Sequence, residues 1–191
     1  MIPQAINNRH WNYLLALDGD AAILSRYIEF APDNYDTYSI ELGRLLMAAA
    51  AEVDVAAKLA CAHVPGSGKA DNILDYQRIL AAARPRLPTY PVSIHRFGLA
   101  LTPWSNWTVP SVPDWWTAYN KVKHERGTHF RLANLKHTLN ALSALHVMLI
   151  YAFPAEASEG SLVPPSLLSI PDNAHDGWSH MGTYTTINYR L

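Results

Sequence analysis

The chain has few of the residues that would point to a simple functional class. Its 191 residues include one cysteine, Cys61, which excludes an internal disulfide framework and any multi-cysteine zinc site. The longest apolar run, residues 141–153, is interrupted by Ser143 and His146 and is shorter than the ~20 residues that a membrane span needs. The N-terminal residues lack the basic and apolar regions of a signal peptide. We therefore expect a soluble, cytoplasmic protein without a membrane partner.

Net charge is also nearly absent. Fifteen basic and sixteen acidic residues give a formal charge of −1, so the molecule as a whole does not attract a polyanion. The basic residues are nevertheless unevenly placed, because five of them lie within residues 115–137 beside one acidic residue, Glu125. A local basic segment flanked by aromatic residues is typical of a surface that contacts phosphate groups. A solvated helix face is the alternative interpretation.

Apolar residues recur at helical spacing in five segments, which are residues 5–31, 38–63, 73–83, 113–126 and 133–153. The sequence Asp18-Gly19-Asp20 predicts a kink or turn within the first segment, and Gly127 predicts the end of the fourth. Alternating apolar residues between prolines predict two strands or an extended arm at about residues 90–107. The turn-rich residues 154–191 predict an irregular C-terminal extension that finishes in a short strand at 183–189.

These segments predict one mostly α domain, residues 1–191, built as a helical bundle. The bundle core is expected at about residues 5–153, with a small β-like insertion at 90–107 and the C-terminal extension after it. The clustered tryptophans, Trp104, Trp107, Trp115 and Trp116, are expected to pack in the core or an interface. His146 lies on an apolar helix face and is interpreted as a core histidine with satisfied hydrogen bonds.

The helix predicted at 113–126 contains the residues best suited to chemistry. Asn120 and His124 are four residues apart and therefore share one helix face. Histidine is the side chain that most often moves protons near neutral pH, so His124 could act on a ribose hydroxyl or a leaving oxygen. Lys121, Lys123 and Arg126 could hold the phosphate. A structural pair of Asn120 and His124 is the alternative. The histidine spacings show no metal-binding pattern, so we expect no metal and no cofactor.

A second set of polar residues interrupts the alanine-rich helix predicted at 38–63. Asp54 and Lys58 have the spacing of a weak ion pair. Glu52 or Asp54 could instead support the site by bonding the His124 imidazole, if this helix packs against the Asn120 and His124 face. Arg44, in the same helix, is expected to pair with Glu41.

Two stretches carry a family resemblance: WWTAYNKVKHER at residues 115–126 and YSIELGRLLMAAAAEVDVAAKLAC at 38–61. They resemble uncharacterised bacterial proteins related to the HEPN superfamily, whose members are bundles of four to five helices and are often metal-independent endoribonucleases. The resemblance implies that His124 is the motif histidine and Asn120 the polar position of the motif. Tyr119 stands where the family has arginine. Lys121, Lys123 or Arg126 must therefore replace that arginine, or the site binds without cleaving.

The resemblance implies an HEPN-like protein that binds RNA or nucleotides. If the protein is an enzyme, the resemblance implies a metal-independent endoribonuclease. It also implies a homodimer with a composite site and a role in bacterial stress, toxin activity or phage defence. The alternative function is a non-catalytic dimerising interaction module, in which Asn120 and His124 form a structural polar layer. The protein partner, RNA substrate and trigger are not indicated by the residues.

Overall fold

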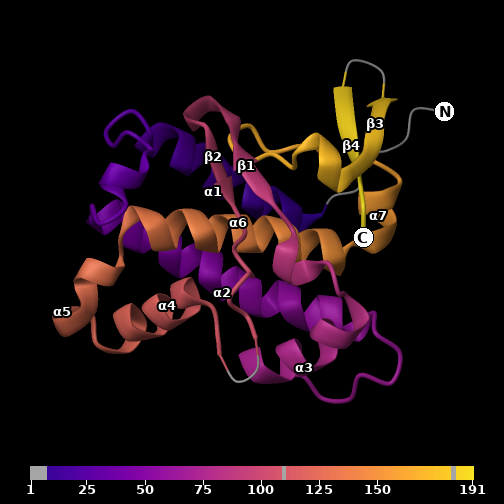
Figure 1. Ribbon diagram of the computed structural model, residues 1–191, viewed down its shortest axis with the longest axis horizontal. Coiled ribbons are helices and arrows are strands. Elements are labelled where there is room, and N and C mark those ends of the chain that lie inside the picture. The colour runs from indigo at the N-terminus through magenta and orange to yellow at the C-terminus, as the bar shows by residue number, and fades with distance from the viewer. Residues whose placement is uncertain (1–7, 109–110, 182–183) are drawn as a thin grey trace.

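The computed structural model describes residues 8–108, 111–181 and 184–191 (Figure 1). Its α-helices are α1 (Arg9–Leu24), α2 (Ile40–Ala62), α3 (Ile73–Ala83), α4 (Asp114–His124), α5 (Arg126–His129), α6 (Leu135–Ala152) and α7 (Pro154–Ser158). Its strands are β1 (Val92–Ile94), β2 (Leu99–Leu101), β3 (His175–Met181) and β4 (Tyr184–Tyr189). The predicted mostly α fold is confirmed. Residues 5–7 of the first predicted helix and residue 183 of the predicted strand lie outside the described residues.

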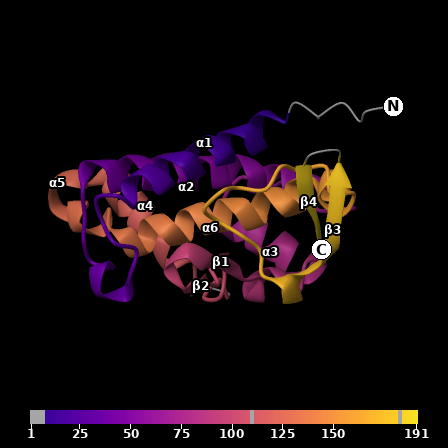
Figure 2. The same ribbon diagram turned by 90° about the horizontal axis from the view of Figure 1, so that it is seen from above.

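The two longest helices, α2 and α6, pack along each other at the centre of the molecule. Each begins at a polar cap, because Ser39 accepts a hydrogen bond from the Leu42 amide and Asn134 accepts one from the His137 amide. Alanines on the buried face of α2 allow close approach, and residues 141–152 of α6 are all buried. In Figure 2, α1 lies on one side of α6 and the β1–β2 hairpin on the other.

The first helix corrects a prediction. We expected a kink at Asp18-Gly19-Asp20, but α1 is continuous from Arg9 to Leu24. The Asp18 carboxylate is buried and accepts hydrogen bonds from the amides of Ser166, Leu167 and Leu168 and from the Ser166 hydroxyl, at 2.8–3.3 Å. A residue typical of turns is thus used here to anchor a segment that is distant in the sequence.

Both small sheets are antiparallel hairpins. The predicted β-like insertion is confirmed as β1 and β2, with Val92 opposite Leu101 and a turn at Gly98, whose φ of +63° favours glycine. The C-terminal extension is more regular than predicted, because β3 and β4 pair from His175 opposite Tyr189 onward. The extension is also joined to β1 by a backbone bridge between Ser93 and Ser169.

One hydrophobic core joins most of these elements, from Trp11 in α1 to Tyr189 in β4, although α5 and β3 contribute no described residue to it. The four tryptophans at 104–116 are buried in it, as predicted. His146 is fully buried as expected, but neither ring nitrogen has a hydrogen-bond partner among the described residues, so the prediction of satisfied bonds is wrong. No helix in the described part of the chain combines the length and apolar character needed to cross a membrane.

Candidate nucleic-acid interface

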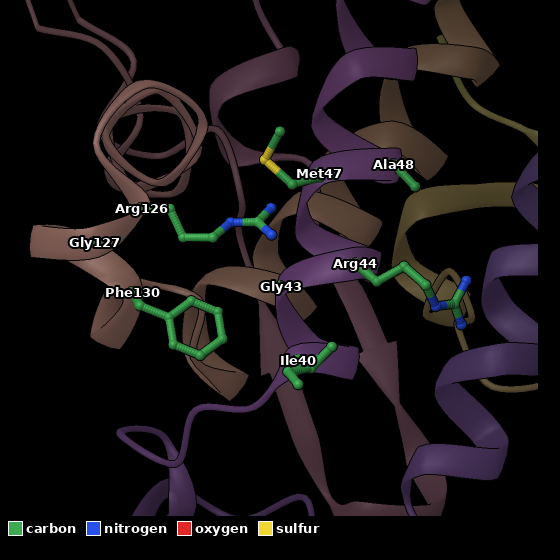
Figure 3. A pocket seen from close by; sticks show the side chains of 8 residues that line it. All are labelled: Ile40, Gly43, Arg44, Met47, Ala48, Arg126, Gly127 and Phe130. Atoms are coloured by element: carbon green, nitrogen blue, oxygen red, sulfur yellow. The ribbon is translucent and has the colours of Figure 1, made fainter.

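Helix α4 positions the basic residues, and it ends two residues earlier than predicted. Its last residue is His124. The backbone amide of the next residue, Glu125, donates a hydrogen bond of 2.8 Å to the Lys121 carbonyl oxygen and caps the helix. Gly127 does not stop the helix, since it lies inside the short α5. The chain turns at Glu125, so His124 and Arg126 belong to different helices and Arg126 is directed back toward α2 (Figure 3).

Tyr119 faces the protein interior. Its side chain is only 6% exposed, and its ring centroid lies 5.4 Å from that of Trp116. The Lys123 ammonium lies over the Tyr119 ring, 5.3 Å from its centroid, which is cation–π geometry. The Tyr119 ring therefore packs against the Lys123 ammonium. Because Tyr119 is buried, a phosphate could be contacted here only by neighbouring side chains.

Asn120 and His124 share a face of α4 but do not form a polar layer between helices. The half-buried Asn120 amide donates to the Trp116 carbonyl oxygen at 3.1 Å, within its own helix. His124 is exposed, and no other described residue hydrogen-bonds its ring. The imidazole is therefore accessible to a ligand.

Four exposed basic side chains gather where α4 passes into α5. We call this group, Lys121, Lys123, His124 and Arg126, the basic end; it is the region of α4 and α5 in Figure 1. No described carboxylate forms an ion pair with any of its members. The carboxylate of Glu125, the neighbour of His124 in sequence, instead has its Oε2 3.3 Å from His129 Nε2. The three members in α4 also interact favourably with the negative end of the helix dipole, so they are compatible with the helix even without a partner.

An open pocket of about 860 Å³ adjoins the basic end (Figure 3). It lies between α2 and the segment formed by α5 and the 3₁₀ turn η4 (Phe130–Leu132), and it is lined by Ile40, Gly43, Arg44, Met47, Ala48, Arg126, Gly127 and Phe130. Gly43 makes this packing possible, because a Cβ there would lie 3.3 Å from Ala133 Cβ and 3.4 Å from Phe130. Arg126 extends across the pocket toward Met47. The result is an apolar surface with a guanidinium at its edge.

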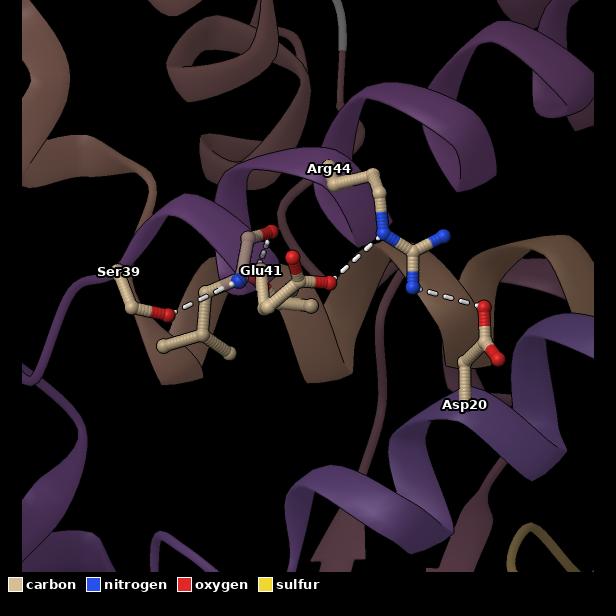
Figure 4. A network of polar contacts seen from close by, with 6 residues as sticks. Asp20, Ser39, Glu41 and Arg44 are labelled. Atoms are coloured by element: carbon tan, nitrogen blue, oxygen red, sulfur yellow. Dashed lines mark hydrogen bonds and ion pairs between the residues drawn. The ribbon is translucent and has the colours of Figure 1, made fainter.

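The other arginine of this pocket, Arg44, is already bonded to two carboxylates. Arg44 Nε donates to Glu41 and its terminal nitrogen donates to Asp20, both at 2.8 Å (Figure 4). The predicted pairing with Glu41 is confirmed, and the hydrogen bond to Glu41, followed by that to Asp20, raises the pKa of Arg44. Figure 3 shows its side chain directed away from Arg126. Arg126 is therefore the arginine that a ligand can reach.

The proposed carboxylate support for His124 is wrong. Glu52 Oε1 lies 2.5 Å from His10 Nδ1, which joins α2 to α1. Asp54 bonds Lys58 as its spacing predicted, at 2.7 Å, and also accepts from the Tyr76 hydroxyl at 2.7 Å. Neither contacts His124, because the basic end meets the first three turns of α2 and both carboxylates lie further along that helix.

The pocket residues Ile40, Met47 and Phe130 were missed at the sequence level. Apolar residues at helical spacing normally indicate core, and nothing local marks these three as partly open. Ile40 is the most exposed of the three, at 77%, and only the structure reveals this.

Comparisons with protein-family models, curated protein sequences and solved structures found no match for this chain. Within the described residues, no three His, Cys, Asp or Glu side chains gather as a metal site would require.

Proposed function

We propose that this chain is an HEPN-like protein that binds RNA through the basic end. The observation that carries the proposal is the group of four exposed basic side chains without carboxylate partners, in a molecule whose overall charge is −1. Unpaired Lys and Arg side chains release counterions from a phosphate backbone, which is the main source of nucleic-acid affinity. The rest of the molecule has twelve basic and sixteen acidic side chains, a net charge of −4, so this attraction is confined to one end.

The adjoining pocket favours single-stranded RNA. Phe130 and Met47 offer apolar surface to an unstacked base, and the Arg126 guanidinium can stack on a base or hold the phosphate next to it. Bases inside a duplex are paired and stacked, so they cannot enter this pocket without being unpaired. The proposal therefore includes a preference for single strands over duplexes of the same sequence.

Cleavage is the finer part of the proposal, and the accessibility of His124 supports it. In that reaction His124 would take the proton of a ribose 2'-hydroxyl as its oxygen attacks the adjacent phosphorus. The 5'-oxygen of the next nucleotide would leave with a proton taken from water, and one product would end in a 2',3'-cyclic phosphate. Lys121 and Arg126 would neutralise the charge on the phosphate oxygens. Asn120 would position the phosphate through the second hydrogen of its amide nitrogen, because only one is donated to the Trp116 carbonyl oxygen.

A specific observation also favours the dimerising module as a second candidate. Ile40, Met47, Ala51 and Val55 follow one stripe of α2, with Ile40 77% and Val55 39% exposed. A symmetric contact between two such stripes would bury them and bring two basic ends near each other. Sedimentation of the wild type and of Ile40→Lys tests this candidate: a dimer that the substitution disrupts supports it, and a wild-type monomer contradicts it.

The principal experiment compares wild type, His124→Ala and His129→Ala. His129 is the matched control because it is a nearby histidine already paired with a carboxylate. Each protein is incubated with single-stranded RNA and mixed tRNA in EDTA, and fragment ends and RNA binding are both measured. We expect binding by all three proteins and cyclic-phosphate products from wild type and His129→Ala only. Binding without cleavage would leave an RNA-binding protein, and absence of binding would contradict the proposal.

A further inference from the structure

A second, smaller pocket lies away from the basic end and is lined mainly by polar groups. It has a volume of about 350 Å³ and is formed by the segment after β2, the start of α4, the start of α6 and Tyr35. Its volume is at the lower end of the range of small-molecule sites, which is about 300–1,000 Å³. The Lys136 backbone amide donates a hydrogen bond of 3.1 Å to the Tyr35 carbonyl oxygen, which holds two walls of the pocket together.

His137 presents a fixed hydrogen-bond acceptor to this pocket. Its Nδ1 lies 3.3 Å from the Leu132 carbonyl oxygen, which can only accept, so Nδ1 carries the hydrogen. Burial, and to a smaller extent the charge of Lys136, lowers the pKa of His137 to about 4. The ring is therefore neutral at pH 7, and Nε2, to which no described residue donates a hydrogen bond, is an open acceptor.

Two side chains of opposite charge line the pocket and do not form an ion pair with each other. Lys136 and Asp114 both line it and are exposed, and neither forms an ion pair with any described residue. The Asn140 amide nitrogen donates to the Lys136 carbonyl oxygen at 2.9 Å, which leaves its amide oxygen as a further acceptor. The pocket thus offers one cation, one anion and neutral acceptors within a small volume.

We propose that this pocket binds a small zwitterion of the free amino acid type. Its carboxylate would pair with Lys136, and its ammonium group would pair with Asp114 and donate a hydrogen bond to His137 Nε2. The volume excludes large cofactors, and the balance of charges disfavours a ligand that carries only one sign. This site is independent of the RNA-binding proposal, since it contains none of the four residues of the basic end.

The test uses the full chain and the free amino acids as probes. Thermal unfolding is recorded with each of the common amino acids in turn, because a ligand that binds only the folded state raises Tm. Any amino acid that raises Tm is then titrated calorimetrically beside its N-acetyl and C-terminal amide derivatives. We expect each derivative to bind about tenfold or more weakly, since each loses one charge-assisted contact.

Variants locate the binding site. Lys136→Gln and Asp114→Asn should each weaken binding of the same amino acid by about tenfold or more, whereas Lys58→Gln, at a cation already paired with Asp54, should not. Both pocket residues are exposed, so their variants should fold normally, and circular dichroism verifies this. The proposal is overturned if no amino acid raises Tm, if the blocked derivatives bind equally well, or if both pocket variants bind like wild type.

Discussion

The basic end and the side of α2 that faces α1 differ in whether their charged side chains form ion pairs. Between α1 and α2, Arg44 bonds Asp20 and Glu52 bonds His10, and Arg44 also bonds Glu41 within α2. At the basic end, Lys121 and Arg126 are exposed and unpaired among the described residues. Paired charges fix how the two helices meet, whereas unpaired charges of one sign contribute little to the fold and remain free for a ligand. The contrast distinguishes charges that join helices from charges that are accessible to a ligand.

The largest expected effect comes from the most fully paired charge. Asp18→Ala removes the acceptor of three backbone amides, and those of Leu167 and Leu168 belong to buried residues. Unsatisfied buried amides cost about 1–3 kcal/mol each, so the free energy of unfolding should fall by about 3 kcal/mol or more. Urea unfolding measures this change. A loss below about 1 kcal/mol would show that the anchor of residues 166–168 is not structural.

Acid should destabilise the protein through its buried neutral histidines. Burial lowers the pKa of His146 to about 3 and that of His137 to about 4, both below the value near 6.5 expected in the unfolded chain. Between pH 6.5 and about 4 the unfolded state therefore binds more protons, so stability is highest above pH 6.5 and falls as the pH is lowered through this window. Urea unfolding at a series of pH values measures the slope.

His146→Leu supplies the matched variant for this pH series. It replaces a ring with two unbonded nitrogens by an apolar side chain, so stability at pH 7 should be retained or increased. The dependence on pH below 6.5 should become shallower. An unchanged slope would mean that His146 is not buried as a neutral group.

Arg126→Gln and Arg44→Gln sharpen the contrast between free and paired charge within one pocket. Loss of Arg126 should weaken single-stranded RNA binding by about tenfold at low salt and leave stability within about 0.5 kcal/mol of wild type. Fluorescence anisotropy with a labelled oligonucleotide measures the affinity. Equal losses of affinity in the two variants would contradict the assignment of Arg126 as the accessible arginine.

Among the substitutions of paired charges, Arg44→Gln has the smallest expected effect, and this effect is on stability. Arg44→Gln breaks two exposed ion pairs, and each is worth about 0.2–1 kcal/mol, so the free energy of unfolding should fall by about 1 kcal/mol. RNA affinity should be unchanged. Chemical unfolding beside Arg126→Gln makes the comparison, and a larger loss at Arg126 would reverse our account.

Local patterns predicted the fold better than the site. The long helices α2 and α6 follow from apolar periodicity, and the β1–β2 hairpin follows from alternation between prolines. Asp18 was misjudged because its partners lie about 150 residues away in the sequence. The partners of Glu52 and the pocket beside Phe130 likewise depend on how helices pack, which local spacing does not reveal.

The central claim is that unpaired cations at the basic end, and not positive charge in general, bind RNA. Its most direct test is the salt dependence of single-stranded RNA affinity for two triple variants. One replaces Lys121, Lys123 and Arg126 by Gln, and the other replaces the ion-paired Arg44, Lys58 and Arg78 by Gln. Each lowers the formal charge from −1 by three, to −4.

We predict that the first triple variant loses most of its affinity and that the slope of log affinity against log salt falls by about two to three. The second should bind nearly as wild type does. Equal weakening of both variants, or an unchanged slope in the first, would contradict the account.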